Sequence, residues 1–83
     1  MITPQKKAKL IWNCRRGMLE LDLMLSRFVS KHLDNLTDAQ IRAFETLLNA
    51  QDPDLYVWLV GQETPPDKEL AEIVAFIRLH HNA

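Results

Sequence analysis

The sequence contains few of the residues that stabilise or activate small proteins through special chemistry. It has one cysteine and two glycines among 83 residues. A single cysteine excludes an intramolecular disulfide, and there is no CxxC pair, histidine–cysteine ladder or calcium-loop pattern to hold a structural metal. With two isolated glycines, a glycine-rich phosphate loop is also excluded. So short a chain must gain its stability from close packing of secondary structure around one small core.

Long apolar stretches are missing as well. No run approaches the roughly 20 apolar residues that are needed to cross a bilayer, so no membrane insertion is expected. The lysines near the N-terminus are not followed by an apolar segment, which predicts that there is no signal peptide. Together with the single cysteine, this predicts a cytoplasmic protein in a reducing compartment.

The charge is nearly balanced overall but unevenly distributed. The net charge is −1, yet residues 1–16 carry five basic residues and no acid. This basic segment is either a solvated first helix or an electrostatic guide toward an acidic partner. Nucleic acid is not an expected partner, because the acidic remainder would repel phosphates. Asp52 and Asp54 would also face the duplex if the third and fourth expected helices acted as a helix-turn-helix.

Helix start signals recur along the chain, and no segment alternates at period two. The sequence therefore predicts an all-α fold, a compact five-helix bundle that forms a single domain over residues 1–83. The expected starts are Thr3-Pro4, Met18, Thr37, Asp52-Pro53 and Thr64-Pro65. Thr37 and Gln40 form a capping-box pattern. Asp52 is expected to cap the fourth helix, and Gly61 to end it in a left-handed conformation.

The second expected helix, residues 18–33, has the clearest apolar face. The residues of this face fall at three- and four-residue steps: Met18, Leu21, Leu25, Phe28 and His32, with Leu33 beside it. Leu19, Leu23 and Met24 widen this face, so the helix is expected to be central and to be covered on several sides. The two tryptophans are interpreted as core residues, with aromatic anchors of a docking surface as the alternative.

The candidates for catalysis are few, and none is complete. Arg15 and Arg16 could lower the pKa of Cys14, but no histidine is near this thiol in sequence, so it is interpreted as structural. His80 and His81 would point about 100° apart on a helix, which makes them a poor metal pair. Their place at the end of the last helix favours dipole capping. The sequence therefore predicts that the protein is not an enzyme and holds no metal.

The segment Arg15–Glu20 is the strongest candidate for a functional surface. One interpretation is structural: Gly17 caps the second helix, and Glu20 at its third position bonds back to the cap amide. The other is functional: Arg16 and Glu20, four residues apart, share a helix face, and Gly17 leaves a flat patch that a protein partner can approach closely. The residues alone leave both interpretations open.

Two stretches carry a resemblance to a known family. They are CRRGMLELD at residues 14–22, which contains the pattern RGxxE, and DPDLYVWL at residues 52–59. With this spacing and chain length, the sequence resembles the small FAD assembly factors of succinate dehydrogenase, the SdhE family. It is similar also to the mitochondrial succinate dehydrogenase assembly factor 2. Bacterial members have also been described as an antitoxin, CptB.

The resemblance implies a cytoplasmic five-helix protein that binds the flavoprotein subunit of succinate dehydrogenase, and of fumarate reductase. Such a protein promotes covalent attachment of FAD to a histidine of that client. Arg16, Gly17 and Glu20 would form the functional motif, with Arg15 and Asp22 as neighbouring partner contacts. FAD would reside in the client, and none would be bound stably by this chain. We expect a monomeric, chaperone-like factor, with an antitoxin that acts by protein–protein binding as the alternative.

Overall fold

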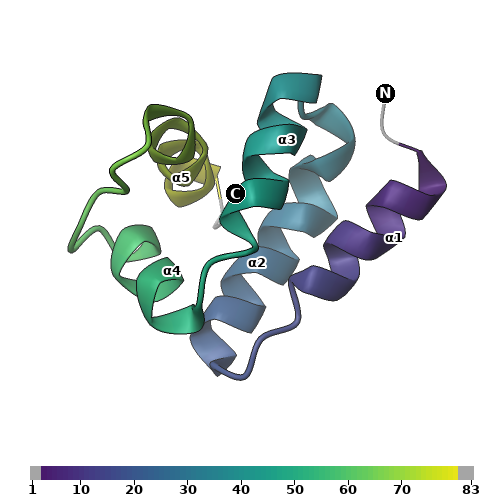
Figure 1. Ribbon diagram of the computed structural model, residues 1–83. Coiled ribbons are helices and arrows are strands. Elements are labelled where there is room, and N and C mark those ends of the chain that lie inside the picture. The colour runs from purple at the N-terminus through teal and green to yellow at the C-terminus, as the bar shows by residue number, and fades with distance from the viewer. Residues whose placement is uncertain (1–2, 81–83) are drawn as a thin grey trace.

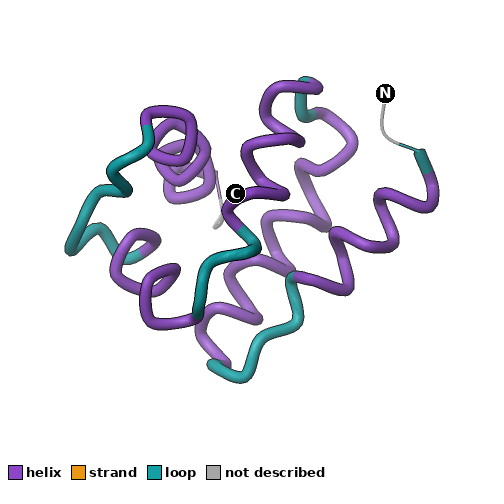
Figure 2. Tube along the Cα trace, in the orientation of Figure 1, coloured by secondary structure: helices purple, strands orange, loops and turns teal. Residues whose placement is uncertain are grey.

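Helices make up nearly all the regular structure of residues 3–80, the part of the chain that the computed structural model describes. Figure 2 shows them joined by short loops, with no strand in this range. The elements are α1 (Pro4–Asn13), α2 (Leu19–His32), the 3-10 helix η1 (Leu33–Asn35), α3 (Asp38–Leu47), α4 (Asp52–Leu59) and α5 (Lys68–His80). The predicted all-α, five-helix fold is confirmed. None of these helices is long and apolar enough to cross a membrane.

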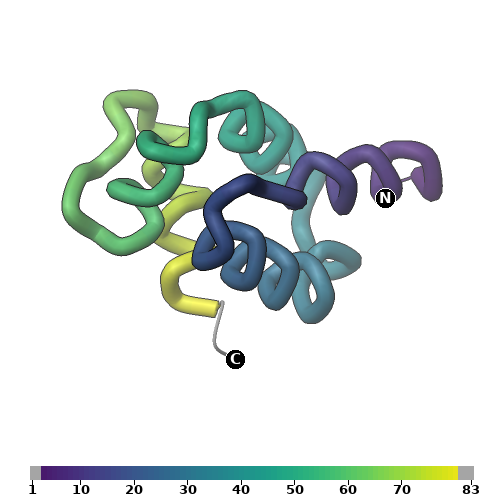
Figure 3. The backbone as a smooth tube through the Cα atoms, turned by 90° about the horizontal axis from the view of Figure 1, so that it is seen from below, coloured from purple at the N-terminus to yellow at the C-terminus, as the bar shows by residue number. Residues whose placement is uncertain are grey.

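Helix α2 lies in the middle of the molecule. Figures 1 and 3 both place α1 on one side of it and α4 and α5 on the other. Helix α5 packs against α3 and α4, and α4 also contacts α2. The loop between α1 and α2 and the connection between α3 and α4 come together at one end of the central helix (Figure 1), where Arg16 bonds to carbonyls of that connection.

The core follows the predicted face of α2. Leu21, Leu25 and Phe28 are fully buried, and the rings of Phe28 and Phe44 lie 5.7 Å apart between centroids. Leu19 and Leu23 do not extend this face as expected, because they point away from the bundle and are 68% and 45% exposed. The rest of the core comes from all the other elements: Leu10, Cys14, Leu33, Leu36, Ile41, Ala43, Leu47, Leu48, Leu55, Leu59, Ile73, Val74 and Ile77.

Helix α1 is held by few contacts. Leu10 is its one buried residue within the described chain, and ion pairs join Lys6 to Glu45 at 2.8 Å and Lys7 to Asp34 at 2.9 Å. Trp12 is 74% exposed, so the prediction that it belongs to the core is wrong. A helix that contacts the bundle along one edge leaves its other faces in solvent, and Trp12 lies on such a face. The other tryptophan, Trp58, is partly buried and packs against the core.

The helix ends agree with the sequence in part. Thr37 and Gln40 form the predicted capping box, with bonds of 2.9 and 3.1 Å. Gly61 ends α4 with the expected positive φ, +86°. Helix α5 begins at Lys68, later than predicted. The Asp67 carboxylate precedes it and accepts bonds from the amides of Glu69 and Leu70, as an N-cap side chain does.

The last turn of α5 is fixed by rings. The His80 ring stacks on His32 of α2 at 5.0 Å, and Phe76 meets His80 edge-on at 4.4 Å. This packing gives His80 a tertiary role in addition to its expected place at the negative end of the helix. His81, expected beside it, lies outside the described residues.

Candidate partner-binding site

The motif segment forms the loop between α1 and α2 and the first turn of α2. The helix begins at Leu19 with Met18 as its N-cap, and no side chain of the segment bonds to its first turn. The predicted cap at Gly17 is therefore wrong, and Glu20 is the second residue of the helix instead of the third. Arg16 precedes the helix, so it does not share a helix face with Glu20 as expected.

A distant residue bonds to the N-cap residue of α2. The Asp52 carboxylate reaches across from the first turn of α4, and its Oδ2 accepts a bond from the Met18 amide at 3.3 Å. Asp52 was expected to cap its own helix, but Gln51 occupies the N-cap position of α4. One carboxylate thus lies at the N-termini of two helices, where the positive ends of both dipoles favour a negative charge.

Arg16 is bound inside the molecule. Its Nη2 donates to the Leu48 carbonyl, and its Nη1 donates to the Ala50 carbonyl at 3.3 Å and to Asp52 Oδ1 at 3.5 Å. Its side chain is 13% exposed. Leu48 is the C-cap of α3, so the guanidinium satisfies carbonyls that the helix end leaves free, and its charge suits the negative end of the dipole.

Gly17 lies on the surface between Arg16 and Met18, the two residues that bond to Asp52. Its φ is outside the left-handed region. Among the described residues, Gly61 is the one glycine with a positive φ. A Cβ placed on Gly17 would be 3.9 Å from its nearest neighbour, Asp52 Oδ2, which is an ordinary contact. Neither the backbone conformation nor the neighbouring atoms therefore require a glycine at this position.

The remaining predicted residues surround Gly17 with charge. Glu20 is exposed. Arg15 is also exposed, and its Nε lies 3.9 Å from Asp22 Oδ1, beyond hydrogen-bond distance. Asp22 itself is half-buried, and its Oδ1 has no hydrogen-bond partner among the described residues. We call the exposed surface of Arg15, Gly17 and Glu20 the motif edge; along the chain it places a cation before and an anion after a position without a side chain.

Apolar side chains are exposed next to the motif edge. Ile11, Trp12, Leu19 and Leu23 are 44–74% exposed, and they belong to the helix ends that flank the loop. A shallow groove of about 210 Å³ also runs along this side, between α1 and α2, and Arg15 is part of its lining. The combination of exposed large apolar groups with exposed charges is typical of a surface that contacts another protein.

Cys14 lies beneath the motif edge, in the core. The residue is 2% exposed. Burial raises the pKa of its thiol to about 12; nearby Arg16 opposes this rise, and Asp22 adds to it. The expectation that the arginines beside Cys14 could lower this pKa is wrong, because desolvation is the larger effect. A protonated, buried thiol agrees with the structural interpretation of this residue.

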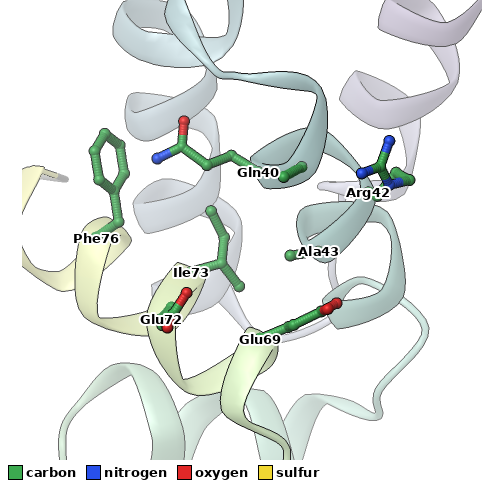
Figure 4. Close-up of a pocket in the computed structure, with 8 residues that line it drawn as sticks. Gln40, Arg42, Ala43, Glu69, Glu72, Ile73 and Phe76 are labelled. Atoms are coloured by element: carbon green, nitrogen blue, oxygen red, sulfur yellow. The ribbon is translucent and has the colours of Figure 1, made fainter.

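A second hollow lies away from the motif, between α3 and α5. It has a volume of about 270 Å³, and Figure 4 shows Gln40, Arg42 and Ala43 of α3 on one side of it and Glu69, Glu72, Ile73 and Phe76 of α5 on the other, with the Gln40 side chain extending toward Phe76. None of the predicted site residues lines this cleft. Over residues 3–80, no group of three or more histidine, cysteine or acidic side chains is placed to hold a metal ion.

The sequence interpretation missed Asp52 as a member of the site. The only signal available was the recurrence of DPDLYVWL beside RGxxE in the family resemblance, which indicates that the two stretches act together. Asp52 and Met18 are 34 residues apart, and helix periodicity does not predict contacts over such a separation.

Comparison with known proteins agrees with this architecture. A family model described as flavinator of succinate dehydrogenase matches residues 8–81. FAD assembly factor SdhE of Legionella pneumophila (strain Lens) is 55% identical over 74 residues, which are 89% of this chain and 92% of that protein. FAD assembly factor SdhE of Photobacterium profundum is 40% identical over 83 residues, which are 100% and 94% of the two chains. The solution structure of a UPF0350 protein, 39% identical, superposes with a TM-score of 0.81 and covers 99% of this chain and 87% of that one. The chain therefore belongs to the family of flavinators of succinate dehydrogenase.

Proposed function

We propose that this protein is an FAD assembly factor. It binds the flavoprotein subunit of succinate dehydrogenase, and of fumarate reductase where a cell makes one, and promotes covalent attachment of FAD to that subunit. Family membership and the names of the relatives support the flavinator role. Gly17 is the observation that carries the choice of surface, because it is an exposed glycine that neither its φ nor its neighbours require.

The motif edge is the surface that meets the client. An absent side chain at Gly17 lets a client backbone approach closely, while Arg15 and Glu20 on either side offer a donor fork and a carboxylate for polar recognition. Exposed Leu19 and Trp12 add apolar area beside it. Tryptophan and arginine side chains are typical of the residues that dominate protein–protein binding energy.

The protein acts by positioning and not by chemistry of its own. Attachment of FAD to a client histidine needs that histidine and the flavin to be held in a reactive arrangement. Correct orientation of two reacting groups can contribute about 7–11 kcal/mol to lowering a barrier, so a helper that fixes the client conformation needs no catalytic group. The buried, protonated Cys14 is consistent with this role. FAD is held by the client in this proposal.

Deletion of the gene tests the function. We expect loss of most covalent flavin from the flavoprotein subunit, seen as flavin fluorescence of that band on a denaturing gel, and restoration by a plasmid copy. Normal fluorescence in the deletion strain, grown where the complex is required, would overturn the proposal. The antitoxin alternative stays a prediction, and it requires rescue from a toxin in cells that lack succinate dehydrogenase.

A further inference from the structure

We propose that Asp52 is a positioning residue for the motif: it does not touch the client, but it fixes the conformation in which the motif edge is presented. The inference rests on the proposed function, since it concerns the same surface. It adds a residue of α4 to a site that the sequence confines to residues 15–22.

The two carboxylate oxygens of Asp52 bond to different partners. Oδ1 pairs with Arg16 Nη1 at 3.5 Å, and Oδ2 accepts the Met18 amide at 3.3 Å. These two bonds fall on the residues immediately before and after Gly17. Asp52 therefore holds the loop on both sides of the glycine, and Gly17 is fixed between two anchored positions.

Neighbouring carbonyls complete the attachment. Arg16 also donates to Leu48 and Ala50, both in the connection between α3 and α4. Figure 1 shows this connection and the loop before α2 converging at one end of the molecule. The pattern R-G-x-x-E spans a loop and the first turn of a helix, so the relative placement of Gly17 and Glu20 depends on how this junction is held.

The chemistry requires a carboxylate at position 52. Both partners of Asp52 are donors, one of them charged, and an ionised carboxylate can accept from both at once. An asparagine has one acceptor oxygen, and its NH₂ group would face a donor. Hydrogen bonds to charged groups are also the stronger class. Asp52→Asn therefore removes one of the two anchors while leaving the size of the side chain unchanged.

Asp54 provides the matched control. It lies in the same first turn of α4, is exposed, and loses the same charge in Asp54→Asn. We expect Asp52→Asn to lower client flavinylation, or affinity for the purified client subunit, about tenfold, which is the scale of one charged hydrogen bond. Asp54→Asn should change either quantity less than about twofold, because surface substitutions without specific contacts have small effects.

A double-mutant cycle separates positioning from general destabilisation. If Asp52 acts through the Arg16-anchored loop, Arg16→Ala combined with Asp52→Asn should be no more than about twofold worse than Arg16→Ala alone, because residues of one network are not additive. Effects that multiply would overturn the proposal. So would wild-type flavinylation by Asp52→Asn when Arg16→Ala is defective. If neither Arg16→Ala nor Gly17→Arg lowers flavinylation, it is the proposed function that fails.

Amide hydrogen exchange of the unmodified protein gives a readout that needs neither a client nor a stable variant. The Met18 amide should exchange at least about tenfold more slowly than that of exposed Gly17, because the Met18 amide is bonded to Asp52. In Asp52→Asn this protection should fall, and in Asp54→Asn it should not. Equal exchange of the two amides in the unmodified protein would overturn the proposal even if Asp52→Asn failed to fold.

Discussion

Arg16 and Asp52 are 36 residues apart in the chain, and their side chains meet at 3.5 Å. Around this pair the C-terminal end of α3, the N-terminal end of α4 and the loop before α2 come together. The arginine supplies positive charge to helix carbonyls, and the aspartate supplies negative charge to helix amides. The segment Arg15–Glu20 is thus built into a three-helix junction, and its residues divide between those that hold the loop and those that face outward.

Arg16 should contribute to stability, unlike its neighbour in sequence. Arg16→Ala leaves the carbonyls of Leu48 and Ala50 without this donor, so we expect the free energy of unfolding to fall by about 1–3 kcal/mol. Arg15→Ala removes a largely exposed side chain and should cost less than about 0.5 kcal/mol. Urea denaturation followed by circular dichroism measures both. Equal stability of the two variants would contradict the arrangement described for Arg16.

Gly17 should tolerate substitution in the fold but not in the function. Gly17→Ala places a Cβ at ordinary distance from Asp52 and should leave the melting temperature nearly unchanged. Gly17→Arg should remain helical by circular dichroism while it abolishes client binding, because its side chain occupies the space that the client backbone needs. Unfolding of Gly17→Arg would instead indicate that the glycine is structural.

Glu20 should show the same separation in a milder form. Its exposed carboxylate lies in the first turn of α2, where its contribution to the fold is an interaction with the positive end of the helix dipole. Glu20→Gln should cost about 0.3–1 kcal/mol of stability at most. Covalent flavin in the client should fall severalfold. A variant with normal flavinylation would remove Glu20 from the motif edge. Glu69→Gln is the matched control, because it also removes an acidic residue from the first turn of a helix, α5, away from the motif edge.

Cys14 gives the stability a dependence on alkaline pH. Because burial raises the thiol pKa from 9.0 to about 12, the unfolded chain loses this proton first. The contribution of Cys14 is therefore complete below pH 9 and is lost as the pH rises from 9 toward 12, by about 1.4 kcal/mol for each unit. The free energy of unfolding of the wild type should fall more steeply over this range than that of Cys14→Ala. Parallel curves would contradict the raised pKa.

The sequence predicts the helices well and their contacts poorly. The capping box at Thr37, the stop at Gly61 and the buried face of α2 are local patterns, and the structure confirms them. The caps of α2 and α4 were predicted wrongly for one reason. A helix end was assigned the nearest suitable residue, whereas Asp52 bonds to a different helix from the one it begins. Trp12 was placed in the core because an apolar residue type does not reveal which edge of a lightly held helix faces solvent.

The candidate site residues can be proposed from the sequence because RGxxE is contiguous. The sequence does not predict which of these residues hold the loop and which face solvent. Nothing in the order of Arg15 and Arg16 shows that the second is 13% exposed and the first 71%. That difference depends on where the end of α3 lies, which is a product of the tertiary fold.

The central claim is that the motif edge, on a folded scaffold, promotes covalent attachment of FAD to its client. The most direct measurement uses purified components: the apo flavoprotein subunit, FAD, and this protein or its Gly17→Arg variant, with covalent flavin fluorescence followed over time. We predict faster attachment with the wild type than without it, and no acceleration by the folded Gly17→Arg variant. Equal rates with wild type, with variant and with no added protein would contradict the account.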